Sequence, residues 1–429
     1  MSTSWFDSRD LRDKSPFGAV PCGTRVQFCL RPEADAAITR CELLAHAEFA
    51  DHWETIPLEA AREDGATVFR GAYVAPRQAD LVWYHFRLLW ADGGTSCYGK
   101  TGLCAWDAVE PWQLTVYDDT HKTPEWFGRG LTYQIFPDRF CRAKKREITG
   151  LVGPRTLHEC WDEAPEYRPN EQGEITCSDF FGGDLAGITE KLDYLSSLGV
   201  TTLYLCPIFE ASTNHRYDTA CYERIDPLLG TEEDFRTLCE RAHERGIRVL
   251  LDGVFNHTGR KSVYFNADGF YPTLGAAQGE QSPYYRWYSF HPFPDDYDAW
   301  WGIKNLPAVN ETEESYVDYI IEGEHSIIRR WLRAGASGWR LDVADELPDG
   351  FIAAIRRVME EKTPDGYLLG EVWEDGTTKI AYSRRRKYLL GRETHGLMNY
   401  PFRTALLDYL RGGDAAVFRE RMEELREHY

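Results

Sequence analysis

Residues 338–342 read Gly-Trp-Arg-Leu-Asp, and residues 367–371 read Tyr-Leu-Leu-Gly-Glu. Each is a short apolar run that ends in a carboxylate, and a third run, 247–251, is followed by Asp252. Between the first two, residues 351–359 carry apolar side chains at helical spacing. Near-continuous apolar runs joined by helices are typical of parallel strands buried on both faces. Because the carboxyl ends of parallel strands share one edge, we expect the three carboxylates to lie close together.

The alternation of strand and helix extends over the sequence from about residue 125 onward. Further strands are predicted at 131–136, 200–205 and 397–400, and helices at 185–199, 231–246, 317–332 and 414–427. A long aromatic segment at 258–310 is expected to form a short loop domain. No G-x-G-x-x-G follows the first strand, which argues against an open dinucleotide-binding sheet. The pattern predicts a (β/α)8 TIM-type barrel, incomplete in this sequence because it supplies about six βα units.

The first 124 residues show a different pattern. Val26, Phe28 and Leu30 alternate with polar neighbours, and the runs 68–74 and 81–90 lie between Gly, Pro and Asp residues. Several short strands without a helical period indicate an all-β sandwich. We therefore divide the sequence into a sandwich domain at 1–124 and a barrel domain at 125–429.

The charge and the cysteines limit the class of protein. The 429 residues include 49 Lys and Arg against 69 Asp and Glu, a net charge of −20, which argues against nucleic-acid and anionic-membrane partners. No apolar run reaches about 18 residues, so we expect no membrane span, and the first residues lack the pattern of a secretory signal. The eleven cysteines form no C-x-x-C pair. We interpret them as free thiols and predict a cytoplasmic protein.

Two carboxylates on neighbouring strands are what glycoside hydrolysis requires. Strands lie about 4.8 Å apart, and carboxyl groups about 5–5.5 Å apart favour retention of configuration. Arg340 precedes Asp342 by two residues and points to the same side, where it would keep that carboxylate ionised. Apolar neighbours would raise the pKa of Glu371 and suit it to donate a proton. The alternative is structural: Asp342 and Arg340 form an ion pair, and Glu371 pairs with a helix start.

Five strings of the sequence resemble signatures of the α-amylase family of glycoside hydrolases. They are Asp-Gly-Val-Phe-Asn-His at 252–257, Gly-Trp-Arg-Leu-Asp-Val-Ala-Asp-Glu at 338–346, Gly-Glu-Val-Trp at 370–373, Thr-Asn-His-Arg-Tyr-Asp-Thr at 213–219 and Phe-Phe-Gly-Gly-Asp-Leu at 180–185. The overall organisation resembles the neopullulanase, cyclomaltodextrinase and maltogenic amylase branch. The resemblance implies a retaining hydrolase of α-1,4 and some α-1,6 glucans, such as maltodextrins, cyclodextrins, pullulan or starch.

The resemblance also implies a role for individual residues. Asp342 would be the nucleophile and Glu371 the acid/base. The other residues expected to bind or support the substrate are Arg340, His257, Tyr217, His215, Asp252, Asn256, Glu346 and Trp373. Tyr217 would stack under the reacting glucose, and Glu346 would lie towards the leaving group. For Asp252 and Asn256, a purely structural role remains an alternative.

Three features depart from the family pattern. None of the twelve histidines precedes an Asp, so the third carboxylate, which the family carries in a His-Asp pair after the seventh strand, is missing. We expect a longer protein or a second copy to supply the remaining strands. The stretch 141–146, where several relatives bind calcium, carries Arg142, Lys144, Lys145 and Arg146. This positive charge argues against calcium, and we expect no required cofactor and no metal site. Residues 306–310, Leu-Pro-Ala-Val-Asn, replace a common Met-Pro-Lys-Leu-Asn.

Two other functions stay open at this point. The chain could be a transglycosylase, or a catalytically silent α-glucan-binding or scaffold protein that kept the fold. The resemblance further implies a homodimer. Trp83 and Trp90 could bind starch from a starch-binding-like sandwich, but they lie in an apolar run that favours burial.

Overall fold

The computed structural model describes residues 4–144, 152–171, 173 and 175–429, and it divides them into two compact units. The first comprises the chain up to Lys122 together with Trp373–Glu393 and Asn399–Tyr429. The second comprises Thr123–Val372 and Thr394–Met398. The first unit thus takes in two segments of the region that was expected to form the barrel domain.

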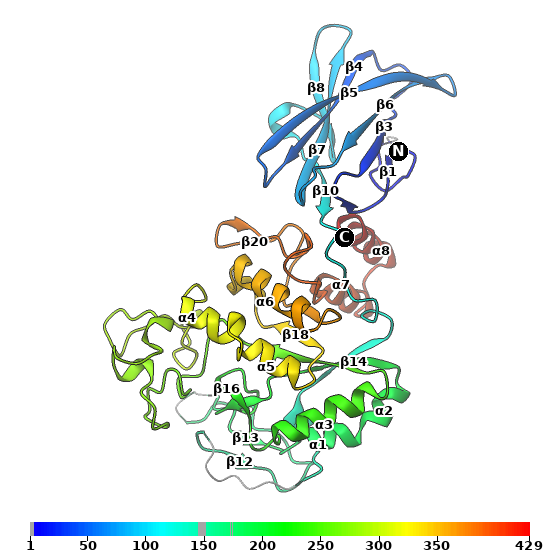
Figure 1. The fold of residues 1–429 in the computed structure, drawn as a ribbon. Helices are drawn as coiled ribbons and strands as arrows, with labels where there is room; N and C mark the ends of the chain where they lie inside the picture. The colour runs from blue at the N-terminus through cyan, green and yellow to red at the C-terminus, as the bar shows by residue number, and fades with distance from the viewer. Residues whose placement is uncertain (1–3, 145–151, 172, 174) are drawn as a thin grey trace. The chain divides into compact units, whose positions relative to one another are not determined.

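The first unit is built on a largely antiparallel ten-stranded sheet in which eight strands follow the order β1-β3-β6-β5-β4-β7-β10-β2, while β8 pairs with β7 and β9 pairs with β8. Their bounds are Lys14–Ser15 (β1), Val20–Pro21 (β2), Arg25–Leu30 (β3), Ile38–Ala47 (β4), His52–Glu63 (β5), Ala66–Val74 (β6), Asp80–Trp90 (β7), Thr95–Gly99 (β8), Gly102–Cys104 (β9) and Trp112–Tyr117 (β10). Strand β5 pairs with β4 through residues 52–58 and with β6 through residues 59–63. The sheet therefore folds over itself, and an all-β region is confirmed (Figure 1).

Alternate residues of these strands fill one core. Phe28 of β3, Leu43 of β4, Phe69 of β6 and Phe86 of β7 are all buried and belong to one apolar cluster. The period of two seen at Val26, Phe28 and Leu30 thus places these side chains between the two halves of the sheet.

Three segments from the end of the chain belong to this unit as well. They are the hairpin Ile380–Ala381 (β20) and Arg384–Arg385 (β21), and the helices Tyr400–Leu410 (α7) and Ala415–His428 (α8). Gln113 Nε2 donates to Thr377 Oγ1 at 2.9 Å, and Thr115 Oγ1 donates to the carbonyl of His428 at 2.8 Å. These buried contacts with β10 explain why the segments group with the first unit.

The second unit contains a six-stranded parallel sheet in the order β11-β14-β17-β18-β19-β22. The strands are Leu131–Ile135 (β11), Val200–Leu205 (β14), Arg248–Gly253 (β17), Gly338–Leu341 (β18), Tyr367–Gly370 (β19) and Gly396–Leu397 (β22). Strands adjacent in sequence order are neighbours in space, as in a (β/α) barrel, and the predicted incomplete barrel is confirmed. Short pairs complete the strands: Thr156–Leu157 (β12) with Asp179–Phe180 (β13), and Phe209–Ala211 (β15) with Thr219–Ile225 (β16).

Four of the five connections between these strands contain helices, and the fifth, between β19 and β22, carries the β20–β21 hairpin instead. The helices are Leu185–Glu190 (α1), Leu192–Ser197 (α2), Glu232–His243 (α3), Glu314–Val317 (α4), Ile327–Arg333 (α5) and Asp349–Lys362 (α6). Helix α1 packs against α3, and α5 packs against α6 (Figure 1). The segment between β17 and α4 is long, contains only short 3₁₀ turns and agrees with the predicted long loop.

The structure corrects three boundaries. The single helix predicted at 185–199 is broken at Lys191 into α1 and α2. The helix predicted at 317–332 consists of α4, one π-helical turn at Asp318–Glu322 and α5, with a break at Gly323, where a side chain would collide with the carbonyl of Asp318. The sixth strand ends at Leu397, and Tyr400 already begins α7, because the Asn399 side chain caps that helix.

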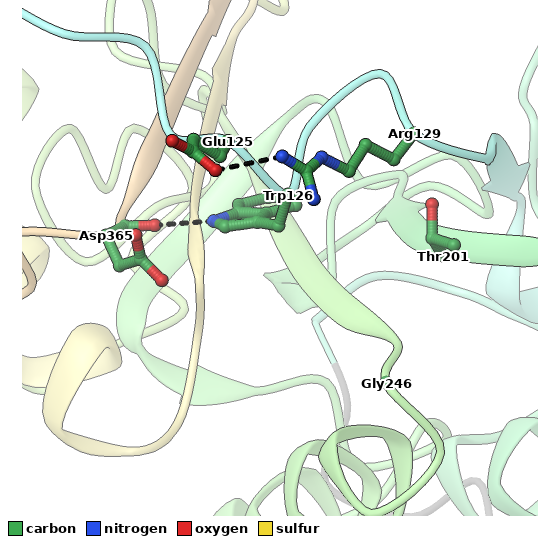
Figure 2. A pocket seen from close by; sticks show the side chains of 6 residues that line it. All are labelled: Glu125, Trp126, Arg129, Thr201, Gly246 and Asp365. Carbon is green, nitrogen blue, oxygen red and sulfur yellow. Dashed lines mark hydrogen bonds and ion pairs between the residues drawn. The ribbon is translucent and has the colours of Figure 1, made fainter.

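The amino-terminal edge of the parallel sheet carries a shallow pocket of about 530 Å³ (Figure 2). Its lining residues precede or begin strands β11, β14, β17 and β19: Glu125, Trp126, Arg129, Thr201, Gly246 and Asp365. Trp126 Nε1 donates to the carbonyl of Asp365 at 2.8 Å, and Arg129 pairs with Glu125 at 2.8 Å. Barrel proteins carry stabilising contacts at this edge and catalytic groups at the other. We therefore describe the carboxyl edge as the candidate site.

We predict that Phe28→Ala lowers the free energy of unfolding by about 3–5 kcal/mol, because it leaves a cavity in a core that the surrounding strands cannot close. Phe28 is 2% exposed and contacts Phe6 and Tyr84. Urea unfolding followed by fluorescence would measure the change. Val74→Ala, at a half-exposed position of β6, is the control and should stay within about 0.5 kcal/mol of the parent.

Candidate functional site

One guanidinium group contacts three carboxylates at the carboxyl edge of the sheet. Arg340 Nη1 lies 2.8 Å from Asp252 Oδ1 and 2.7 Å from Asp342 Oδ1, and Arg340 Nη2 lies 2.7 Å from Glu371 Oε2. All four side chains are buried. The three carboxylates that the sequence places after consecutive strands are therefore brought together around one positive charge.

The strand register explains this convergence. Asp252 of β17 is the partner of Arg340 in β18, and Leu341 is the partner of Gly370 in β19. Asp342 directly follows Leu341, and Glu371 directly follows Gly370. The two acids therefore lie at the same level of neighbouring strands, and such strands are about 4.8 Å apart. Arg340 and Asp342 differ by two positions and share one side of their strand, as the sequence predicts.

Two tyrosines hold Asp252. The hydroxyl of Tyr204 donates to Asp252 Oδ2 at 2.5 Å, and the hydroxyl of Tyr217 donates to the same oxygen at 3.0 Å. The Arg340 guanidinium also lies over the Tyr204 ring, with its Cζ atom 5.4 Å from the ring centroid. Asp252 thus accepts from two hydroxyls and one guanidinium, which makes it a support for Arg340.

The turn after β18 carries backbone strain. Val343 has φ 41° and ψ 62°, a left-handed conformation that is costly for a β-branched residue. This conformation directs its backbone N–H to Glu371 Oε2, at 2.9 Å. The backbone carbonyl of Glu371 in turn accepts from Ala344 N at 3.0 Å. The strained turn therefore fixes the position of Glu371 relative to Asp342.

The charges of the cluster do not cancel. The pKa of Asp342 is raised to about 8, mainly by burial and further by the neighbouring Asp252 and Glu371, although Arg340 lowers it. Burial likewise raises the pKa of Asp252. Three ionised carboxylates with one guanidinium would leave two uncompensated negative charges in a buried site. The cluster therefore retains a proton near neutral pH.

Tyr217 connects His257 to the cluster, because it contacts both His257 and Asp252. The Nε2–H group of His257 donates to the Tyr217 carbonyl at 3.1 Å, and burial lowers the pKa of His257 to about 4, so the ring is neutral at pH 7. Its Nδ1 and both amide atoms of the buried Asn256 have no partner among the described residues. The backbone of Asn256 accepts from Val309 N at 3.1 Å. These two side chains keep unused hydrogen-bonding capacity next to the cluster.

His215 holds the loop that carries Tyr217. Its Nδ1 accepts from the backbone N–H of Tyr217 at 3.1 Å and lies 3.1 Å from Thr213 Oγ1. A pocket of about 480 Å³ lies beside it, lined in part by Asp218 and Arg260. His215 thus lines a cavity as well as shaping the Tyr217 backbone.

The aromatic loop above the strand ends divides into buried and exposed rings. Trp287 and Tyr288 are buried and pack inside the loop. Trp300 stacks on the His257 ring at 5.5 Å, and Trp301 stacks on Trp300 at 5.0 Å while remaining 66% exposed. A row of three rings therefore leads from His257 towards solvent.

Two further predicted site residues, Glu346 and Trp373, follow the cluster in the sequence. Glu346 lies half-buried in the short turn Ala344–Glu346 that follows the cluster. Trp373 is 46% exposed and belongs to the first compact unit, where its ring lies 6.5 Å from Tyr400. A substrate-binding role for either residue stays a prediction.

The residues expected near a calcium ion do not fit that ion. Asp184 Oδ1 accepts from the backbone N–H of Ala143 and Gly187, and its Oδ2 accepts from that of Lys144. Its oxygens are therefore occupied by donors, as a helix cap requires. Lys145 and Arg146 of the same stretch lie outside the described residues. Within the described ranges, no group of three metal-ligating side chains is found.

Sequence reasoning missed Tyr204 and Val343. Tyr204 occupies the same side of β14 as Leu250 does in β17, two residues before Asp252, so the register could have placed it below the cluster. The left-handed turn at Val343 has no local signal, because Val is among the residues least suited to it.

The parallel sheet and the buried cluster of carboxylates at its carboxyl edge define a barrel protein with a polar site of the glycoside-hydrolase type. The family model for the alpha amylase catalytic domain matches residues 134–429. The chain therefore belongs to the alpha-amylase family, and the resemblance seen in the sequence is confirmed.

Individual relatives agree with this assignment. The chain is 34% identical over 476 residues to an amylopullulanase of Thermoanaerobacterium saccharolyticum, covering 99% of this chain and 36% of the relative. It is 34% identical over 337 residues to an intracellular maltogenic amylase of Bacillus subtilis, covering 76% of this chain and 51% of the relative. A solved cyclomaltodextrinase superimposes with a TM-score of 0.61 at 28% identity, over 97% of this chain and 67% of the other. The chain thus spans about a third to a half of these curated relatives.

Among the described residues, no helix has both the length and the apolarity that a membrane span needs.

We predict that Asp342→Asn raises the thermal unfolding midpoint, and does so more at pH 8 than at pH 4. The pKa of Asp342 is raised from 3.8 to about 8, so ionising it costs folding free energy as the pH rises between those values. Each pKa unit corresponds to about 1.4 kcal/mol, and we expect a gain of about 1 kcal/mol or more at pH 8. Calorimetry would measure the midpoints. A gain independent of pH, or one matched by the exposed Asp295→Asn, would contradict the buried-charge explanation.

Proposed function

We propose that the chain carries the nucleophile and the acid/base of a retaining glycoside hydrolase that acts on α-1,4 glucans. The observation that carries the proposal is the contact of one Arg340 guanidinium with Asp342 and Glu371, which leave neighbouring strands at the same level. Such close carboxyl groups favour a covalent intermediate over direct attack by water, which needs a wider gap.

The first step uses the two carboxyl groups in opposite protonation states. Glu371 gives its proton to the glycosidic oxygen while an Asp342 oxygen attacks the anomeric carbon, and the bond between that carbon and the leaving oxygen breaks. Arg340 contacts Asp342 Oδ1 and favours its charged form, in opposition to the burial that raises the pKa of Asp342. The Val343 N–H and Arg340 Nη2 both contact Glu371 Oε2 and hold its carboxyl group in place.

The second step returns the site to its starting state. The Glu371 carboxylate takes a proton from water, the water oxygen attacks the anomeric carbon, and the ester bond to Asp342 breaks. Two inversions at the same carbon release a product in the α configuration. Neutral His257 and Asn256 supply unused hydrogen-bonding atoms for the sugar hydroxyls, and Tyr217 supplies a ring beside them.

The substrate class follows from the family. The relatives named above include an amylopullulanase and an intracellular maltogenic amylase, and a solved neighbour is a type III pullulan hydrolase from Thermococcus kodakarensis with a TM-score of 0.60 at 28% identity, covering 98% of this chain and 69% of that chain. We therefore propose maltodextrins, cyclodextrins, pullulan or starch as substrates, with some α-1,6 cleavage. The reaction needs no cofactor, because the two carboxyl groups supply both the nucleophile and the proton.

We also propose a reducing, cytoplasmic setting for the protein. Its eleven cysteines are all free, which suits a reducing cytoplasm, and the Bacillus subtilis relative is described as intracellular. A homodimer, with no nucleic-acid or membrane partner, completes the proposal. Light scattering in solution would test the dimer.

We predict that Glu371→Gln lowers the rate of maltoheptaose cleavage by about 10²–10⁴-fold, because it removes the proton donor. The loss should be much smaller on 4-nitrophenyl α-maltoside, whose leaving group departs without a proton. Asp342→Asn removes the nucleophile and should lose activity on both substrates alike. Steady-state rates and NMR of the first product anomer provide the measurements.

The exposed Glu374→Gln is the matched control and should keep the parent rate. A β-configured first product would exclude retention. Equal losses on both substrates in Glu371→Gln would remove Glu371 from the acid step. Binding of maltoheptaose without turnover by the parent chain would favour the silent binding protein, and mainly elongated products would favour the transglycosylase.

A further inference from the structure

Two cysteines face each other across the strand pair β8–β9 of the first compact unit. Cys97 of β8 and Cys104 of β9 are direct partners in the antiparallel register, and the Cys104 Sγ–H donates to the Cys97 carbonyl at 3.8 Å. Directly opposed residues of antiparallel strands carry their side chains on the same face, so the two thiols are neighbours. We call Cys97 and Cys104 the thiol pair.

The thiol pair is distinguished by its place in the register. Other cysteines of the described strands have residues of other types opposite them. These are Arg70 opposite Cys29, Leu58 and Leu88 opposite Cys41, and Glu210 opposite Cys221. Within the described strands, the backbone therefore brings two thiols together at this one position.

A row of side chains on one face of the sheet supports the thiol pair. Arg87 of β7 is the register partner of both Cys97 and Glu42, and its Nε donates to Glu42 Oε2 at 2.7 Å. Tyr98, which follows Cys97 in the sequence, points to the opposite face and belongs to the apolar core. The thiol pair thus lies on the polar side of the sheet, with a guanidinium beside it.

The two thiols differ in their access to solvent. Cys97 is 2% exposed, whereas Cys104 is half-buried on β9, which ends this branch of the sheet. A small oxidant in solution therefore meets Cys104 first, and Cys97 reacts through Cys104. Burial raises the pKa of both thiols, while the Arg87 guanidinium favours the thiolate of Cys97.

We propose that the thiol pair is a redox modification site, at which glutathione disulfide converts Cys97 and Cys104 into a reversible cross-strand disulfide. The Cys104 thiolate attacks one sulfur of glutathione disulfide, the bond between the two glutathione sulfurs breaks, and one glutathione leaves as a thiolate that takes up a proton. The Cys97 thiolate then attacks the Cys104 sulfur, the mixed disulfide breaks, and the second glutathione leaves in the same way. The two thiols lose two electrons and two protons, and the oxidant is reduced to two molecules of glutathione.

Strand geometry makes this bond reversible. Directly opposed residues hold their Cβ atoms about 4.5–5.5 Å apart, whereas a disulfide needs about 3.5–4.5 Å. The bond therefore draws β8 and β9 together, and a strained disulfide is reduced more readily than a structural one. The thiol pair stays reduced in a reducing compartment and closes when the glutathione pool becomes oxidised. Closure fastens the hairpin on both sides of its turn at residues 100–101.

Peptide mapping of the full chain tests the proposal. Trypsin cleaves after Lys100, so the reduced pair yields Cys97 and Cys104 in separate peptides, residues 88–100 and 101–122, whereas the disulfide keeps the two peptides joined. The folded chain is incubated with glutathione disulfide at about pH 8, where more thiolate is present, and the remaining thiols are then blocked. We expect the joined peptides, and we expect reduced glutathione to separate them. Cys22→Ser, at a half-buried cysteine of the same unit, is the matched control and should form the bond as the parent does.

Two single variants test the order of the steps. Cys97→Ser should retain one glutathione on Cys104, because no second thiol displaces it. Cys104→Ser should gain glutathione at the buried Cys97 about tenfold more slowly or not at all. Intact mass spectrometry measures both products.

Separate peptides throughout the incubation would overturn the proposal, and so would joined peptides that form only after unfolding in urea or a disulfide between two copies of the chain. Equal modification of the two single variants would contradict the assigned order of attack. A bond that reduced glutathione leaves intact would contradict its reversibility.

Discussion

The Arg340 guanidinium contacts Asp252, Asp342 and Glu371, and the arrangement of the site depends on it. A buried carboxylate without a partner costs several kcal/mol, and three of them around an apolar residue would not stay together. Because the guanidinium is planar and its donors point in fixed directions, it orients the carboxyl groups as well as compensating them. Tyr204, which lies under Arg340 and donates to Asp252, fixes the arginine in turn.

The parallel register and one strained turn supply the rest of the geometry. Partners at equal level in β18 and β19 bring Asp342 and Glu371 side by side without any special local sequence. The left-handed Val343 then adds an N–H at Glu371 Oε2. Such strain is tolerated only where surrounding structure determines the conformation, and here buried strands precede and follow the turn. The buried strands on either side thus hold Val343 in its strained conformation.

Much of this could be predicted from the sequence, and the failures have physical causes. Apolar runs followed by carboxylates predicted the parallel sheet and the convergence of Asp252, Asp342 and Glu371, because strand period and register are properties of the backbone. The break at Lys191 and the left-handed Val343 depend on tertiary contacts that outweigh local propensity. The exposure of Trp53 was not predicted either, because a tryptophan in a strand gives the same sequence pattern whether that face of the sheet is covered or exposed to solvent.

The charge balance of the cluster has a consequence for its chemistry. Ionisation of all three acids beside one positive charge is costly. Protonation of all three would leave the buried Arg340 charge without an ion-pair partner. Burial raises the pKa of both Asp252 and Asp342, although Arg340 lowers both. The retained proton therefore belongs to the cluster as a whole. In the proposed reaction, a sugar whose anomeric carbon approaches Asp342 would draw the negative charge to that carboxyl group and leave the proton on Glu371, next to the leaving oxygen.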